Sequence, residues 1–305
     1  MDIQGALNLV FEFLWTLIKV GYELIRGMWR TIVPAEPKDV QDEIILITGT
    51  GHGIGREIAL RFARLGGTIV CVDINAISNE ETVKMIKVDR GKAHAYQCDV
   101  TDRAAVMQLA EKVQREVGEV SILVNNAGIM PCKPLLKHTE QEIRLMNDIN
   151  INANLWMIQA FLPPMMARNY GQIVAMSSMA GLMGIRNVVP YCGSKYAVRG
   201  IMEALAIELR EDERHLTGIK FTTICPYMVD TGLCKKPRIR FPSLMKVVDV
   251  NEAADMIVDA VRREIVEITI PAEWHFLNRY IYRLLPFPAS CVFNDFFNTG
   301  VDSHE

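Results

Sequence analysis

Short apolar runs alternate with longer amphipathic segments from residue 43 to about residue 270. The runs are four to six residues long and are bounded by glycine or polar residues, which is typical of buried parallel strands. Between them, apolar residues recur at three- and four-residue steps, as on one face of a helix. The runs are residues 43–47, 68–72, 93–97, 121–124, 172–176, 219–224 and 266–270. This alternation predicts an α/β fold with a Rossmann-like, doubly wound parallel sheet of about seven strands.

The first thirty residues follow a different pattern. Their polar positions recur at steps of four and three and so form one helical stripe, while the other faces are apolar. The stripe consists of Glu12, Thr16, Lys19, Glu23, Arg26 and Arg30. A spanning helix needs ~20 mostly uncharged residues, whereas a helix in the headgroup region needs a wide apolar face, a charged stripe and interfacial aromatics such as Trp15 and Trp29. We favour the interfacial helix; a spanning helix, or one packed on the core or on a partner subunit, is the alternative.

The chain divides into four predicted segments. Residues 1–33 are a membrane anchor, which the absence of a cleavage site should leave in place, and its terminal arginines favour a catalytic domain on the cytosolic side. Two prolines within residues 34–42 break the helix and mark a linker. Residues 43–271 form the α/β domain. Residues 272–305 form an apolar extension, for which the sequence leaves several roles open. The extension could close a pocket, enter a membrane, pack on the core or pack across a subunit interface.

Composition narrows the function classes. Half of the 305 residues are apolar and the net charge is -3, so we expect no nucleic-acid partner. The seven cysteines are scattered and form no CxxC pair or histidine cluster with metal-ligand spacing. They are predicted to be reduced thiols, and no metal site is expected.

A glycine-rich loop follows the first predicted strand, with the sequence TGTGHGIG over residues 48–55. A strand, such a loop and a helix fit a dinucleotide-binding unit, because glycines let the backbone approach a pyrophosphate at the helix N-terminus. Asp73 ends the second strand, eighteen residues after Gly55. Its carboxylate would accept hydrogen bonds from the adenosine ribose and repel a 2′-phosphate, which predicts NAD rather than NADP.

Tyr191 and Lys195 form a YxxxK pair. Four-residue spacing places both side chains on one helical face, so that one can act on the proton of the other. Ser178 lies thirteen residues before Tyr191, just after a predicted strand, where α/β sheets build their sites.

These motifs, with Cys98-Asp99-Val100, Asn125-Asn-Ala-Gly128 and Asn150, occur in the order and spacing of the short-chain dehydrogenase/reductase family, which residues 43–270 resemble. The resemblance implies that Tyr191 is the general acid/base and that Lys195 favours the tyrosinate and binds ribose hydroxyls. It also implies that Ser178 orients the substrate oxygen and that Asn150 holds a water molecule that belongs to a proton relay. Besides Tyr191 and Lys195, the implied cofactor contacts are Gly49, Gly51, His52, Gly53, Ile54, Gly55, Asp73, Asp99, Val100, Asn126, Ala127, Gly128, Pro226, Val229 and Thr231. One departure is Tyr227, where the family usually has glycine.

Within this family, the chain is similar to a membrane-anchored branch of epidermal-type retinol dehydrogenases and hydroxysteroid dehydrogenases. The matching segments include Asp73-Ile-Asn, Ala160-Phe-Leu-Pro163 and Cys225-Pro-Tyr. The resemblance implies NAD-dependent oxidation of a lipophilic alcohol, in the first place all-trans-retinol. Alternatives are a 17-beta-type hydroxysteroid dehydrogenase, an NADPH-dependent retinaldehyde reductase and a non-catalytic lipid-droplet protein. It also implies the endoplasmic reticulum membrane or a lipid-droplet surface as the location, and a homodimer.

Overall fold

The computed structural model describes residues 3–277 and 281–303. Residues 1–2, 278–280 and 304–305 lie outside the described residues, and they include Tyr280 of the predicted apolar extension. The chain splits into two compact units, Met1–Lys38 and Asp39–Glu305.

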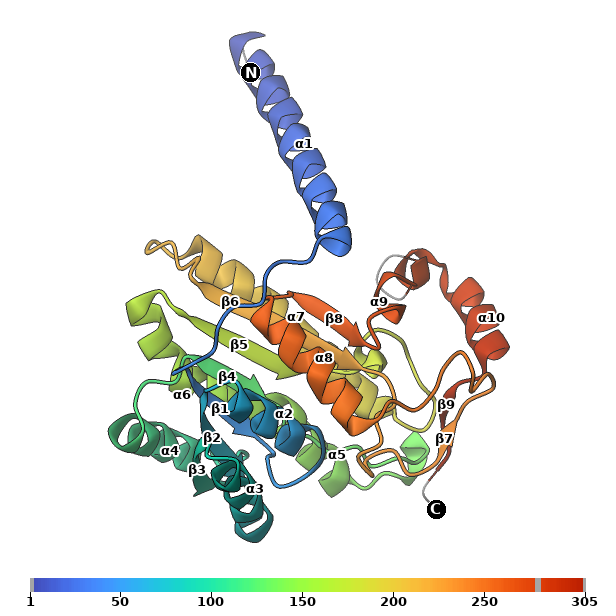
Figure 1. Ribbon diagram of the computed structural model, residues 1–305. Helices are drawn as coiled ribbons and strands as arrows, with labels where there is room; N and C mark the ends of the chain where they lie inside the picture. The colour runs from blue at the N-terminus through green and yellow to red at the C-terminus, as the bar shows by residue number, and fades with distance from the viewer. Residues whose placement is uncertain (1–2, 278–280, 304–305) are drawn as a thin grey trace. The chain divides into compact units, whose positions relative to one another are not determined.

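The second unit is built on a parallel sheet of seven strands in the described part of the chain, in the order β3-β2-β1-β4-β5-β6-β8 (Figure 1). This confirms the predicted fold, and each strand lies within two residues of its expected bounds. The strand order reverses between β1 and β4, which opens a crevice at the carboxyl edge of the sheet. The strands are β1 Ile44–Thr48, β2 Thr68–Asp73, β3 Lys92–Gln97, β4 Ile122–Asn125, β5 Gly171–Met176, β6 Ile219–Pro226 and β8 Glu267–Ile270.

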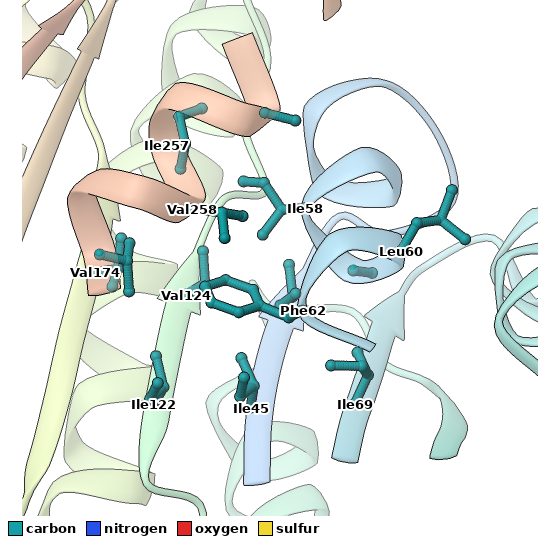
Figure 2. Close-up of a cluster of buried hydrophobic side chains, with 14 of the residues drawn as sticks. Ile45, Ile58, Leu60, Phe62, Ile69, Ile122, Val124, Val174, Ile257 and Val258 are labelled. Carbon is teal, nitrogen blue, oxygen red and sulfur yellow. The ribbon is translucent and has the colours of Figure 1, made fainter. Parts of the chain in front are cut away.

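Helices cover both faces of the sheet. One face carries α2 (Gly53–Arg64), α3 (Ala76–Val88) and α8 (Val250–Arg262), and the other carries α4 (Arg103–Glu116), α6 (Ala153–Arg168) and α7 (Val189–Glu211). Figure 2 shows Ile58 and Phe62 of α2 meeting Val258 of α8 above Val124 of β4. All four side chains are buried. This packing fixes the start of α2 at the carboxyl edge of the sheet.

Short elements shape the loops along that edge. They are η1 Leu135–Lys137, α5 Glu140–Asn147, η2 Asp148–Asn152 and η3 Met179–Gly181. A capping box of Thr139 and Glu142 begins α5, and η2 continues it as one π-helical turn. Such π-turns are rare and are often found at functional sites, and this one contains the predicted site residue Asn150.

The apolar extension packs against the segment that follows β6. It contains α9 (Trp274–Phe276), η5 (Tyr282–Leu284), α10 (Phe287–Phe297) and β9 (Gly300–Val301). Strand β9 pairs antiparallel with β7 (Pro237–Arg238), and Figure 1 shows both beside α10. The Asn187 side chain also donates to the Val301 carbonyl oxygen at 2.9 Å. These contacts bring the end of the chain to the carboxyl edge of the sheet.

The first unit contains the predicted N-terminal helix, α1 (Ile3–Ile32). Its polar stripe is partly satisfied within the helix: Thr16 donates to the Glu12 carbonyl oxygen, and Arg26 pairs with Glu23 at 3.2 Å. In the described part of this unit, no second element covers the apolar faces of α1. Among the described residues, no helix has an apolar stretch long enough to cross a membrane.

Candidate active site

A cavity of about 350 Å³ lies at the carboxyl ends of the central strands. It is lined by every site residue expected from the sequence except Gly51 and Asn150. Residues from the ends of six strands, β1 to β6, and from α7 therefore meet at one place, as expected for the crevice of a doubly wound sheet.

The glycine loop forms a close-fitting cradle in this cavity. A Cβ atom at Gly55 would collide with the Gly49 carbonyl oxygen, and Gly49 and Gly53 have φ angles of +73° and +60°. Helix α2 begins at Gly53, so its first N–H groups have no partner within the helix. His52 is exposed and precedes α2 without a capping hydrogen bond from its side chain. This cradle fits the pyrophosphate of a dinucleotide.

Gly51 lies outside the cavity but holds Asp73 in place. Its N–H donates to one carboxylate oxygen of Asp73 at 2.8 Å, while the Asn75 N–H donates to the other at 2.9 Å. Two backbone donors fix the Asp73 carboxylate at the end of β2. The remaining lone pairs can accept hydrogen bonds from ribose hydroxyls.

The predicted catalytic pair is buried on α7. Tyr191 is 7% exposed and Lys195 is 4% exposed, and the Lys195 Nζ lies 5.6 Å from the centre of the Tyr191 ring. Burial raises the pKa of Tyr191 to about 12, against the opposing effect of a hydrogen bond with Ser178. Burial also lowers the pKa of Lys195 to about 8. The Lys195 ammonium donates to the Met176 carbonyl oxygen at 2.7 Å.

Two adjacent serines, Ser177 and Ser178, have different hydrogen-bond partners, which the sequence alone could not assign. The Ser177 hydroxyl donates to the Lys195 carbonyl oxygen at 2.9 Å, so this residue fastens α7 to the end of β5. The Ser178 hydroxyl accepts from the Ala180 N–H at 3.1 Å and shares a hydrogen bond with Tyr191. Ser178 is therefore the serine placed to contact a substrate oxygen beside Tyr191.

Asn150 lies behind the cavity wall. Its side chain accepts from the Ile129 N–H at 2.9 Å, and donates to the Ile129 carbonyl oxygen and the Ser194 hydroxyl, both at 3.0 Å. A Cβ at Gly128 would lie 3.2 Å from its Oδ1 and 3.5 Å from the Lys195 Nζ. Asn150 thus holds the loop after β4 against α7. The Asn150 Oδ1 accepts the hydrogen bond from Ile129 and has a second lone pair with which it could accept from the predicted water.

The loop after β6 closes over the glycine cradle. A Cβ at Gly53 would lie 3.3 Å from the Thr231 Cβ, which puts Thr231 directly above the start of α2. Tyr227 lines the cavity, and its ring takes up space that glycine would leave open. Burial raises the pKa of Tyr227 to about 12, with the nearby Thr299 side chain opposing the shift.

Several contributors to this site are absent from the sequence prediction. The Thr48 hydroxyl accepts from the N–H groups of Asn126 and Ala127, both at 3.0 Å, and so joins β1 to the loop after β4. Thr48 is the first residue of the TGTGHGIG stretch, and this position was the only available signal. Further apolar lining residues lie in loops or short elements without a periodic pattern and include Ile129, Met130, Ile149, Ile185, Val188, Met228, Leu233, Cys234 and Val301.

A glycine cradle for a dinucleotide and a buried tyrosine–lysine pair in one crevice define an alcohol/carbonyl oxidoreductase of the doubly wound class. The family model for short chain dehydrogenases matches residues 43–239, and the chain belongs to this family. It is accordingly an enzyme that acts on CH–OH groups with a nicotinamide dinucleotide.

The chain is similar to several proteins named for retinoids or steroids. It is 37% identical to human epidermal retinol dehydrogenase 2 over 90% of this chain and 88% of the relative. It is 35% identical to human 17-beta-hydroxysteroid dehydrogenase 13 over 94% of both chains. Human retinol dehydrogenase 10 is 39% identical over 77% of this chain and 75% of its own.

The fold also matches solved structures. A short chain dehydrogenase/reductase from Burkholderia phymatum, in complex with NAD, superposes with a TM-score of 0.72 at 22% identity, covering 80% of this chain and 94% of that one. A gluconate 5-dehydrogenase homologue from Beutenbergia cavernae with bound NADP superposes with a TM-score of 0.67 at 25% identity, covering 79% and 99%.

We expect opposite pH dependences for the two directions of the reaction. With Tyr191 as the general base that the family resemblance implies, oxidation uses the tyrosinate, whose fraction grows about tenfold per pH unit below the raised pKa of about 12. Lys195 keeps its charge only below its lowered pKa of about 8. Hence kcat/KM for oxidation should rise up to about pH 8 and then level off, while kcat/KM for reduction should not rise. Profiles measured at saturating cofactor check this, and oxidation that is faster in acid would contradict it.

Proposed function

We propose that this enzyme oxidises a lipophilic alcohol with NAD, and that its substrate is all-trans-retinol, converted to retinaldehyde. The observation that carries the proposal is the likeness to proteins named retinol dehydrogenase over at least 77% of the chain. The site supports it, because the wall of the cavity near Tyr191 is apolar, with Met179, Val188 and Met228 among its lining residues.

In this proposal, Tyr191 takes the proton of the substrate hydroxyl as the carbinol carbon becomes a carbonyl. The Ser178 hydroxyl hydrogen-bonds the same oxygen and orients it. Lys195, one helical turn from Tyr191, stabilises the tyrosinate by its positive charge. A bound nicotinamide would supply the acceptor for the hydride of the carbinol carbon. The alcohol thus gives up a proton to Tyr191 and a hydride to the cofactor, which together remove two electrons and two hydrogens.

The preference for NAD rests on Asp73. A 2′-phosphate on the adenosine ribose would approach a carboxylate that is already held by two N–H groups and is not free to turn away. The following residue, Ile74, is uncharged and also lines the cavity. The negative charge of the Asp73 carboxylate would repel the negative charge of the 2′-phosphate, and this repulsion disfavours NADP.

A hydroxysteroid is the second candidate substrate. The observation in its favour is the likeness to 17-beta-hydroxysteroid dehydrogenase 13, which covers 94% of both chains.

A panel of substrates tests the proposed function. Purified full-length enzyme is incubated with all-trans-retinol, 17β-hydroxysteroids and fatty alcohols, each with NAD or NADP, and products are separated by chromatography. We expect the highest kcat/KM for retinol with NAD. Turnover of another alcohol without any retinaldehyde would refute the substrate while leaving the chemistry intact.

We further propose that α1 binds the enzyme to a membrane or lipid-droplet surface, with the catalytic unit in the cytosol. The support is its single polar stripe and its otherwise apolar faces, which carry Trp15, Tyr22 and Trp29. A chain that lacks residues 1–33 should stay in the supernatant when the full chain floats with liposomes. Cofactor binding by both chains controls for folding, and flotation of the shortened chain would rule out α1 as the anchor.

A further inference from the structure

A second cavity, of about 380 Å³, adjoins the first one. It lies between the loop after η3, the segment after β6 and the apolar extension. Most of its wall is apolar and includes Met183, Met245, Trp274, Leu277, Phe293 and Phe297. Four of these six residues belong to the extension, which lies beyond the residues 43–239 that match the family model.

The two cavities share part of their lining. Met179, Ile185, Tyr227 and Met228 line both. The first cavity also contains Tyr191, whereas the second does not. The second cavity therefore lies directly beside the part of the first cavity that these four residues line.

One part of the first cavity is assigned to the cofactor. The glycine loop, Asp73, Asp99 and the start of the loop after β4 line this part, and they are proposed cofactor contacts. Around Tyr191 the wall includes the apolar residues Ile185 and Met228, which also line the second cavity. The apolar body of a substrate bound at Tyr191 therefore lies on the side of the second cavity.

The second cavity has the wall that such a body requires. The ring centres of Phe293 and Phe297 are 4.8 Å apart, and those of Trp274 and Phe297 are 6.2 Å apart in an edge-to-face contact. Interlocked aromatic rings give a rigid apolar surface, which is typical of ligand pockets for apolar molecules. The charged residues in this wall are Arg186, Arg238 and Asp295, and Arg238 pairs with Asp302 at 3.4 Å.

We propose that the second cavity is the chamber for the apolar body of the substrate, so that the enzyme takes elongated lipophilic alcohols with the reacting hydroxyl at one end. Tyr227, at the position where the family usually has glycine, forms the passage between the reacting end and the chamber. This inference rests on the proposed function, because it needs an alcohol bound at Tyr191.

Gly184 offers a direct test. It lines the second cavity and not the first, and a Cβ at this position would meet no atom within 4 Å. Gly184 is exposed, so Gly184→Phe places a ring at the rim of the chamber and leaves the lining of the first cavity unchanged. Gly200→Phe is the matched control, because Gly200 is exposed on α7, lines neither cavity and has equally open surroundings.

The substrates are allylic alcohols of increasing length: prenol, geraniol, farnesol and all-trans-retinol. They share one reacting group, so only the body differs. Gly184→Phe should lower kcat/KM for farnesol and retinol about ten- to hundredfold, as expected when a large apolar group loses its burial. It should leave prenol unchanged, and Gly200→Phe should leave the whole series unchanged. An equal loss for prenol and retinol in Gly184→Phe would overturn the chamber.

Binding can be followed without turnover through Trp274. Retinol accepts energy from excited tryptophan, so its binding in the chamber should quench Trp274 fluorescence. The quenching should fall strongly in Trp274→Phe and persist in Trp156→Phe, because Trp156 lines neither cavity. If the enzyme turns over no allylic alcohol, the proposed substrate fails. Quenching by retinol that falls in Trp274→Phe and persists in Trp156→Phe would still support the chamber. Equal quenching in the two variants would refute the chamber.

Discussion

Replacing Tyr191 by phenylalanine is expected to lower kcat for alcohol oxidation by about 10²- to 10⁴-fold, the usual contribution of a positioned general acid/base. The substitution removes only the hydroxyl, and the ring stays in its buried place on α7. No other hydroxyl replaces it, because Ser178 has a far less acidic proton and serves to orient the substrate oxygen. Stopped-flow or steady-state measurement of NADH formation checks the result.

Tyr196 provides the matched control for this prediction. It lies on the same helix, five residues further along, and is 45% exposed. Tyr196→Phe should keep full activity, and both variants should bind NADH as the unmodified enzyme does. Activity of Tyr191→Phe within a factor of a few of the parent would remove Tyr191 from the proposed chemistry.

The second large effect is expected at Asp73. Asp73→Ala should improve the affinity for NADPH relative to NADH by about ten- to hundredfold, because it removes the repulsion of a 2′-phosphate and the hydrogen bonds to the ribose hydroxyls together. Fluorescence titration with each reduced cofactor gives the ratio of the two Kd values.

A second substitution separates charge from geometry. Asp73→Asn keeps an oxygen that can accept the Gly51 N–H, which in the structure lies 2.8 Å from the Asp73 carboxylate. It should recover most of the gain in NADPH affinity while losing less NADH affinity than Asp73→Ala. A parent enzyme that already prefers NADPH, or a ratio that neither variant changes, would contradict the role of Asp73.

The strands and the cofactor crevice were predictable because their signals are local. A buried parallel strand shows itself as an apolar run, and the seven runs correspond to the seven strands of the sheet. The glycine loop, Asp73 and the Tyr191–Lys195 pair each occupy a position that is set by the strand or helix carrying it. A parallel sheet brings all its carboxyl ends to one edge, so these residues had to meet there.

The two serines and Asn150 show the limit of such reasoning. Residues 177 and 178 are adjacent and of the same type, yet one binds the Lys195 carbonyl oxygen and the other contacts Tyr191. Both serines line the cavity, and the position of α7 decides which of them is beside Tyr191 and which is occupied by a backbone carbonyl oxygen. For Asn150, the fixing partners Ile129 and Ser194 are 21 and 44 residues away in sequence.

The sequence by itself determined the sheet, the dinucleotide crevice and the buried tyrosine–lysine pair, since periodicity and short motifs encode them within a few neighbouring residues. The tertiary structure decided the second cavity. Its wall includes Arg238 of β7 and Gly300 of β9, which are paired, and Asn187 donates to the Val301 carbonyl oxygen, 114 positions away in sequence. Apolar residues in the extension carry no mark of whether they face a core, a lipid surface or a ligand, and only their packing around the cavity distinguishes Trp274, Phe293 and Phe297 as its wall.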